Sequence, residues 1–299
     1  MQPAIARQKY RGRLAPSPTG YLHLGHARTF WTVQERARAN GGELILRNED
    51  LDSTRFKMEF AGAMLEDLRW FGFEWGEGPD IGGPFAPYNQ SGRMDLYRAT
   101  LDKLRAGNCI YPCTCSRKDI QAATRAPHAN DDDEPIYPGT CRHNGDKWQV
   151  TSGMNPALVA VSPVTSHPSR PASWRFRVPD GETISFTDKN LGEQKFVAGK
   201  DFGDFVVWRG DGVPAYQLAC VADDAAMQIT EVVRGGDLLV STARQILLYR
   251  ALKLPVPDFF HCELMLDETG ARLAKRHDAL SLQKLREAGR SPEELRRGW

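Results

Sequence analysis

The amino-acid sequence predicts an α/β fold in which a parallel sheet with helical crossover connections is interrupted by an insertion. Strands and helices alternate in the first third of the chain, a pattern typical of parallel sheets. A loop-rich stretch with clustered cysteines and short β segments follows, and the α/β pattern then resumes. We therefore expect a first half at 1–108, an inserted β-containing subdomain at 109–208 and a second half at 209–299.

Two strands and three helices are expected in the first half. Apolar residues recur at helical spacing, for example at Phe60, Met64 and Leu68. Gly41 and Gly72 lie just past the ends of the first two helices, where glycine is common. The expected strands cover 10–14 and 43–47, and the expected helices cover 26–40, 58–71 and a segment that Ser91 caps.

The later part of the chain is expected to contain short strands and then one more α/β unit. Four segments rich in β-branched and aromatic residues lie between Trp174 and Trp208. The α/β pattern resumes at 216–223. A strand is expected at 227–233 and a helix at about 238–252.

The charge balance excludes a basic field over the whole chain. Lys and Arg (39) nearly equal Asp and Glu (38), although 272–299 has a local excess, with eight basic against four acidic residues. A solvated helix face and an RNA contact both remain open for that stretch. No apolar run approaches the ~20 residues that span a bilayer, and the first ten residues lack a signal-peptide core. We expect a cytoplasmic protein without membrane contact.

Four of the six cysteines lie between residues 109 and 141. Without a secretion signal, this clustering favours metal over disulfides. Structural zinc takes four ligands, most often Cys or His, so His128 and His143 compete with a tyrosine for the fourth position. Reduced cysteines without metal are the alternative, and Cys109 is expected to be a small buried residue. The candidate set of three thiolates and one phenol is Cys113, Cys115, Tyr137 and Cys141.

The stretch RLAPSPTGYLHLGHA, at 13–27, joins the first expected strand to the first expected helix. Open α/β sheets bind nucleotides at such a junction. The helix N-terminus offers free N–H groups and a positive dipole end to phosphate. His23 and His26 are three residues apart, so they point to similar sides and could donate hydrogen bonds to phosphate oxygens in a transition state.

The segment APSPTGYLHLGHA resembles the HIGH signature of class I aminoacyl-tRNA synthetases in its glutamate-specific form; the glutamine-specific enzymes usually carry Glu at the position of Ser17. RLAKR at 272–276, after an expected hairpin with its turn at 267–270, resembles the KMSKS loop in its KLSKR variant. Ala274 stands where the family usually has Ser, so one hydroxyl contact is missing. The resemblance implies a Rossmann-like catalytic domain and Mg²⁺ bound with ATP. It implies catalysis by His23, His26 and Lys275, and ATP binding by His23, Gly25, His26 and Lys275.

A glutamate site is expected from charge as well as from the resemblance. Arg13 ends the first strand, where it could form a forked pair with a carboxylate. Glu49 follows the second strand and could take an ammonium group, although a solvated turn is the alternative there. In the family, an R-x-A-P-S segment, a Glu, a later Tyr and a later Arg contact glutamate. The matching glutamate-binding residues are Arg13, Leu14, Ala15, Pro16, Ser17, Glu49, Tyr216 and Arg234.

Two features resemble one subfamily, the glutamyl-queuosine tRNA(Asp) synthetases. They are the zinc pattern CxC followed by YxxxC, and RGGDLLVSTARQ at 234–245. Only 23 residues follow Arg276 (299 minus 276), so we expect no anticodon-binding domain. The resemblance implies one structural Zn²⁺, activation of L-glutamate with ATP, and transfer to queuosine in the anticodon of tRNA(Asp), by a protein expected to be a monomer. The alternatives are ordinary charging of a tRNA 3′ end and a non-catalytic zinc/RNA-binding module.

Overall fold

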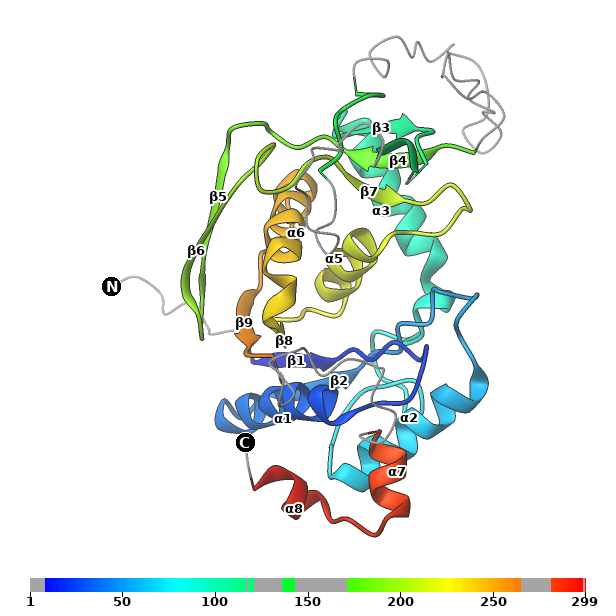
Figure 1. Ribbon diagram of the computed structural model, residues 1–299, viewed down its shortest axis with the longest axis vertical. Helices are drawn as coiled ribbons and strands as arrows, with labels where there is room; N and C mark the ends of the chain where they lie inside the picture. Colours follow the sequence, from blue (N-terminus) through cyan, green and yellow to red (C-terminus); the bar gives the residue numbers. More distant parts are fainter. Residues whose placement is uncertain (1–8, 117, 121–135, 143–170, 265–280, 298) are drawn as a thin grey trace.

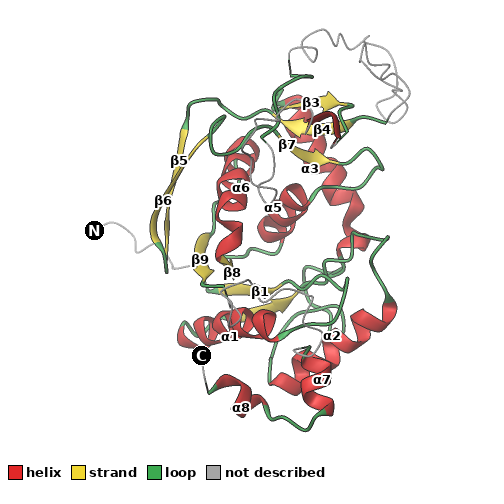
Figure 2. Cartoon of the chain, in the orientation of Figure 1, coloured by secondary structure: helices red, strands yellow, loops and turns green. Residues whose placement is uncertain are grey.

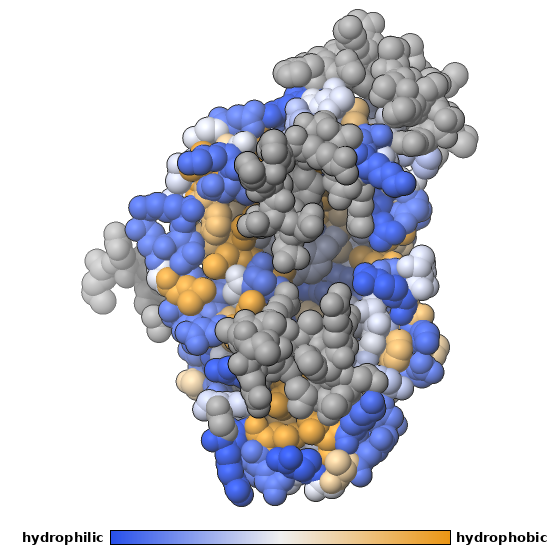
Figure 3. Space-filling view, in the orientation of Figure 1, coloured by the Kyte–Doolittle hydropathy of each residue, from blue (hydrophilic) through white to orange (hydrophobic). Residues whose placement is uncertain are grey.

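The computed structural model describes residues 9–116, 118–120, 136–142, 171–264, 281–297 and 299. Figure 1 shows the N-terminal third of the chain and the last two helices at one end of the long axis, and a smaller group of strands at the other. Most of the face seen in Figure 3 is hydrophilic, with separate apolar patches. Within the described ranges, no helix has the length and apolar character that crossing a membrane requires.

The first two strands pair in parallel, and one helix forms the crossover between them, as the sequence predicts. The register runs from Arg11 opposite Glu43 to Leu14 opposite Leu46. The helix begins two residues earlier than expected, because His23 occupies its N-cap position. The elements are β1 (Arg11–Leu14), α1 (Leu24–Ala39) and β2 (Glu43–Leu46).

The next helix, α2 (Met58–Phe71), has the expected bounds. Gly72 ends it in the left-handed region at φ 92°, which glycine adopts without strain. The expected cap at Ser91 is wrong. Ser91 lies inside a 3₁₀ turn (Gln90–Arg93), and its hydroxyl and backbone N–H both donate to Asp50. Helix α3 (Met94–Ala106) begins only after that turn.

A second parallel pair follows the same plan in the later half of the chain. The expected strand at 227–233 is displaced, because Met227 N–H still donates to Asp223 O at the end of the preceding helix and Gln228 has φ 56°. The backbone N–H of Thr230 donates to Arg11 O, which places the new strand beside β1. The elements are α5 (Tyr216–Ala226), β8 (Glu231–Gly235), α6 (Leu239–Leu252) and β9 (Asp258–Cys262).

The four expected β segments form two separate structures (Figure 2). An antiparallel sheet has the order β3-β4-β7, and a hairpin of β5 and β6 joins β9 through the pair Asp188 and Phe259, giving the order β6-β5-β9-β8. The division of the chain into three segments stays a prediction. The strands are β3 (Ile110–Cys113), β4 (Ser173–Phe176), β5 (Thr183–Asp188), β6 (Gly192–Val197) and β7 (Phe205–Trp208).

Two apolar clusters meet at β8. One gathers residues of α3, α5, α6 and the neighbouring strands, and the other gathers residues of β1, β2, α1, α2 and α7. Val232 belongs to the first cluster and Val233 to the second, because successive strand residues point to opposite faces. The strand that carries Arg234 is therefore held rigidly from both sides. The last helices are α7 (Leu282–Glu287) and α8 (Pro292–Arg296).

Candidate functional site

A cavity of about 280 Å³ lies where β1, β2 and β8 reach their carboxyl ends, the edge at which open α/β sheets bind ligands. Most of the residues expected to bind glutamate or ATP line it. Leu14 is an exception, because its side chain is buried in the core, and Lys275 lies outside the described residues. The expected residues in the lining are Arg13, Ala15, Pro16, Ser17, His23, Gly25, His26, Glu49, Tyr216 and Arg234.

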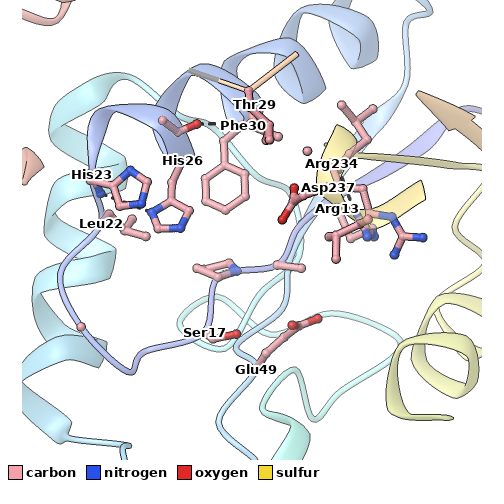
Figure 4. Close-up of a pocket in the computed structure, with 18 of the residues that line it drawn as sticks. Arg13, Ser17, Leu22, His23, His26, Thr29, Phe30, Glu49, Arg234 and Asp237 are labelled. Carbon is pink, nitrogen blue, oxygen red and sulfur yellow. Dashed lines mark hydrogen bonds between the residues drawn. The ribbon is translucent and has the colours of Figure 1, made fainter. Parts of the chain in front are cut away.

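The charged groups of this pocket are separated in space. Figure 4 shows the two imidazoles of His23 and His26 on one side and the guanidinium groups of Arg13 and Arg234 on the other. Glu49 lies below them, near the turn that follows β1. A ligand in the pocket therefore meets two guanidinium groups with the Asp237 carboxylate beside them at one end, Glu49 to one side, and imidazoles at the far end.

Arg13 is held in place by protein groups on one side only. Its Nε donates to Asp224 Oδ1 over 3.3 Å, and its Nη1 donates to Val233 O over 3.1 Å. Nη2 makes no hydrogen bond with any residue that the structure describes. Arginine carries five N–H donors, so Arg13 retains donors for a ligand although it is buried.

Arg47 and Asp224 support this end of the pocket, and neither was predicted from the sequence. The side chain of Arg47 has no solvent exposure and donates to Glu49 Oε1 (2.9 Å) and to Asp224 Oδ1 (2.5 Å). Burial opposes the charge of Arg47, but Asp224, Glu49 and Asp223 outweigh it and raise the pKa of Arg47 well above its usual value. Two adjacent aspartates in the otherwise apolar segment YQLACVADDAA were the available signal, since buried carboxylates need cations.

Arg234 is held more tightly than Arg13. Its Nη2 donates to Thr242 Oγ1 over 2.7 Å, its Nη1 to the hydroxyl of Tyr216 over 3.3 Å, and its Nε to His261 Nε2 over 3.3 Å. Two N–H groups remain for a ligand. Neither Thr242 nor His261 was predicted as a site residue. Thr242 lies in the segment 234–245 that resembles the subfamily, whereas no local motif marks His261 on β9.

The rings of the two histidines of the junction lie against one another at the start of α1, with their planes tilted by 31°. Their ring centroids lie 3.7 Å apart, and the backbone N–H of His23 donates to His26 Nδ1 over 3.3 Å. A Cβ added at Gly25 would lie 3.1 Å from Cε1 of His23, so glycine leaves room for this ring. The arrangement presents two imidazoles and the N-terminus of α1 to the pocket.

The expected hairpin and Lys275 fall within 265–280, outside the described residues. The described residues on either side belong to the site. Glu263 and Leu264 line the pocket, Ser281 forms an antiparallel bridge with His23, and Leu282 N–H donates to Leu22 O.

The four expected zinc ligands come together at one point. The Sγ atoms of Cys113, Cys115 and Cys141 lie within 4.8 Å of one another. The hydroxyl of Tyr137 lies 3.4 Å from Cys113 Sγ and 3.6 Å from Cys115 Sγ. His128 and His143 lie outside the described residues. Cys109, expected to be buried, is only partly so, and its thiol donates to Gly107 O.

The donor set at the cysteine cluster fits a tetrahedral metal ion. Cys115 Sγ and Cys141 Sγ are 3.6 Å apart, close to the ~3.8 Å edge of a tetrahedron with Zn–S bonds of about 2.3 Å. Hydrogen bonding from Cys113 lowers the pKa of Cys141, and the same contact raises the pKa of Cys113, so Cys141 is the thiol of this pair that ionises more readily. All six cysteines are free rather than paired in disulfides.

Comparisons with known proteins agree with the resemblance. The family described as "tRNA synthetases class I (E and Q), catalytic domain" matches residues 9–299. Glutamyl-Q tRNA(Asp) synthetase of Symbiobacterium thermophilum is 50% identical over 94% of this chain and 83% of its own, and that of Nitratidesulfovibrio vulgaris is 47% identical over 93% and 82%. Glutamate–tRNA ligase 2 of Nitrosococcus oceani is 41% identical over 95% of this chain, which spans only 57% of that protein.

A solved structure shows the same architecture. The glutamate–tRNA synthetase of Elizabethkingia anophelis superposes with a TM-score of 0.72 and 31% identity, over 90% of this chain and 53% of that one. The predicted family is thereby confirmed, by sequence over nearly the whole chain and by fold. The chain belongs to the class I tRNA synthetases of the E and Q family.

Proposed function

We propose that the protein activates L-glutamate with ATP as glutamyl-adenylate and transfers the glutamyl group to queuosine in the anticodon of tRNA(Asp). The observation that carries this is the charge arrangement of the pocket, with two arginines, Glu49 and two imidazoles at separate places. It occurs in a chain 50% identical to a glutamyl-Q tRNA(Asp) synthetase. Glutamate has two carboxylates and one ammonium group, and the pocket offers partners to its side-chain carboxylate, to its ammonium group and to phosphate.

Arg13 and Arg234 take the side-chain carboxylate of glutamate in this proposal, and Glu49 takes its ammonium group. The backbone and hydroxyl of the 15–17 turn line the space between them. Both arginines are buried and keep unused N–H donors, so a carboxylate entering here gains charge-assisted, forked hydrogen bonds. The α-carboxylate then points toward the imidazoles.

The α-carboxylate oxygen attacks the α-phosphorus of ATP. A new O–P bond forms, the bond to the β-phosphate oxygen breaks, and pyrophosphate leaves. Such a reaction requires alignment and charge stabilisation more than covalent help. His23, His26 and the N-terminus of α1 at Gly25 receive the phosphates, and Mg²⁺ bound with ATP offsets their charge. Lys275 joins them, since the chain leaves the pocket at Leu264 and returns beside His23.

One structural Zn²⁺ at Cys113, Cys115, Tyr137 and Cys141 would stabilise the region around β3. Four protein ligands leave no open position for substrate. The cluster contains five buried residues (Tyr111, Cys113, Ile120, Tyr137 and Cys141), a small apolar core that metal ligation would reinforce.

The decisive experiment follows labelled glutamate into RNA. The protein is incubated with labelled glutamate, ATP and tRNA(Asp) with and without queuosine, and the label is mapped. We expect label on the modified base and none without queuosine. Label on the 3′ terminal adenosine would favour ordinary charging. Absence of glutamate-dependent ATP–pyrophosphate exchange would favour a non-catalytic RNA-binding module.

A further inference from the structure

A wholly buried pair, Asp188 and His261, lies behind the pocket. His261 Nδ1 is 2.6 Å from Asp188 Oδ2, and neither side chain is exposed. Asp188 also accepts hydrogen bonds from the backbone N–H groups of Asn190, Leu191 and His261. Burial alone would raise the pKa of Asp188, but these hydrogen bonds outweigh it and hold that pKa below its usual value. Asp188 is therefore a carboxylate, which only accepts.

The other ring nitrogen of His261 faces Arg234. Nε2 lies 3.3 Å from Arg234 Nε and 3.0 Å from Thr242 Oγ1. An arginine N–H can only donate, so Nε2 must accept, whereas Nδ1 must donate to Asp188. A neutral ring with its proton on Nδ1 satisfies both. Burial lowers the pKa of His261 below its usual value despite the hydrogen bond with Asp188, which keeps the ring neutral.

We propose that Asp188 and His261 are positioning residues for Arg234. Asp188 fixes the Nδ1–H tautomer of His261, and the Nε2 lone pair then holds the Arg234 guanidinium in the orientation that meets the glutamate carboxylate. This inference rests on the proposed role of Arg234 in binding glutamate. Thr242 and Tyr216 hold the other two nitrogens, so the guanidinium is fixed on its protein side before the ligand arrives, which lowers the cost of ordering it.

The pair also links the β5–β6 hairpin to the pocket. Asp188 is the last residue of β5 and pairs with Phe259 of β9, and the amide of Asn190 donates to His261 O. No residue of the hairpin (183–197) lines the pocket. Through Asp188 and His261, the hairpin therefore reaches Arg234 of a pocket that it does not itself line.

Two substitutions of His261 distinguish the roles of its two ring nitrogens. An asparagine amide reaches about as far as Nδ1, so His261→Asn keeps a donor for Asp188 and removes the acceptor for Arg234. A glutamine reaches about as far as Nε2, so His261→Gln keeps an acceptor for Arg234 and weakens the contact with Asp188. We expect the glutamate KM in ATP–pyrophosphate exchange to rise on the order of tenfold in His261→Asn, and by clearly less in His261→Gln. The ATP KM should stay unchanged in both.

Asp188→Asn tests the tautomer directly. An amide N–H facing Nδ1 turns that nitrogen into an acceptor and moves the ring proton to Nε2, against Arg234. The glutamate KM should rise as in His261→Asn. Asp201→Asn is the matched control, since Asp201 accepts from Val197 N–H at the end of the same hairpin and touches neither His261 nor Arg234; its glutamate KM should equal that of the wild type.

A double-substitution cycle with Arg234→Lys completes the test. If His261 acts through Arg234, His261→Asn raises the glutamate KM little further in the Arg234→Lys background. Three results would overturn the proposal: additive effects on the glutamate KM, equal glutamate KM values for His261→Asn and His261→Gln, or a lower kcat with an unchanged glutamate KM. The last result would indicate a purely structural defect, which reduces the active fraction without changing KM. Failure of the proposed function would instead appear as wild-type protein without glutamate-dependent exchange.

Discussion

Arg47 donates a hydrogen bond to Oε1 of Glu49 over 2.9 Å while its own side chain is wholly buried. The same guanidinium donates to Asp224, which in turn accepts from Arg13. One buried network therefore fixes both the residue proposed to take the ammonium group and one of those proposed to take the carboxylate. The distance between Glu49 and Arg13 is therefore set by the fold before a ligand binds. A site that selects a ligand by the positions of its charges requires such fixed partners.

Removing Arg47 should destabilise the fold as well as the site. Arg47→Met leaves Glu49, Asp223 and Asp224 with too few cations in a buried environment. The loss of one partner from such a group typically costs about 3–5 kcal/mol of unfolding free energy. Chemical denaturation checks this. Arg98→Met is the control, because its pair with Asp95 is exposed and should contribute less than about 1 kcal/mol. Similar losses in the two variants would contradict the role of the network.

The forked geometry of Arg13 should matter beyond its charge. Arg13→Lys keeps one positive charge but cannot contact Asp224, Val233 O and a substrate carboxylate together. We expect the glutamate KM in pyrophosphate exchange to rise on the order of tenfold or more, with the ATP KM unchanged. A wild-type glutamate KM in this variant would assign carboxylate binding to Arg234 instead.

Local patterns predicted most of the strands and helices of this protein, because each depends on a few neighbouring residues, but β3, β9, α7 and α8 were not predicted. The lengths of α2 and the pairing of β1 with β2 followed from apolar spacing and crossover length. The strand β8 was displaced by four residues at its start, because Met227 completes the helix before it. The spacing of apolar residues does not show at which residue such a helix ends.

The supporting residues of the site could not be predicted in this way. Arg47 follows β2, and His261 and Asp188 belong to β9 and β5; only the tertiary fold brings them to Glu49 and Arg234. Each is a polar residue whose partners lie on other elements. The grouping of Cys113, Cys115 and Cys141 was predicted because their type and spacing carry the signal, whereas a lone buried arginine or histidine has partners that only the tertiary structure reveals.

Asp67 should make stability fall as pH rises. It lies on α2 without solvent exposure, and neither carboxyl oxygen accepts a hydrogen bond from a residue that the structure describes. Burial raises its pKa to about 6, although Arg286 opposes this. The folded state thus binds a proton that the unfolded chain releases near pH 4, so the contribution of Asp67 is full below about pH 4 and is lost by about pH 6.

The size of this effect is up to about 3 kcal/mol for a shift of about two pKa units. Asp67→Asn should remove this decrease in the free energy of unfolding with rising pH. Between pH 4 and 7, denaturation curves should therefore show the variant becoming more stable relative to the wild type. Asp95→Asn, at a fully exposed side chain, should leave the profile unchanged. A wild-type profile in Asp67→Asn would mean that Asp67 is ionised in the folded state at low pH.

The cysteine cluster should bind about one zinc per chain when the protein is purified without chelators. Cys113→Ser removes one thiolate of the four-ligand set and should lose most of the metal, because the remaining ligands no longer close a tetrahedron. Cys109→Ser is the control, since Cys109 lies outside the cluster, and its zinc content should equal that of the wild type.

The pocket proposed for glutamate and ATP contains none of the four ligands. Transfer to tRNA should therefore fall in Cys113→Ser by about tenfold more than pyrophosphate exchange does. Metal analysis together with the two assays checks this, and wild-type protein without stoichiometric zinc would contradict the metal site while leaving the adenylation proposal standing.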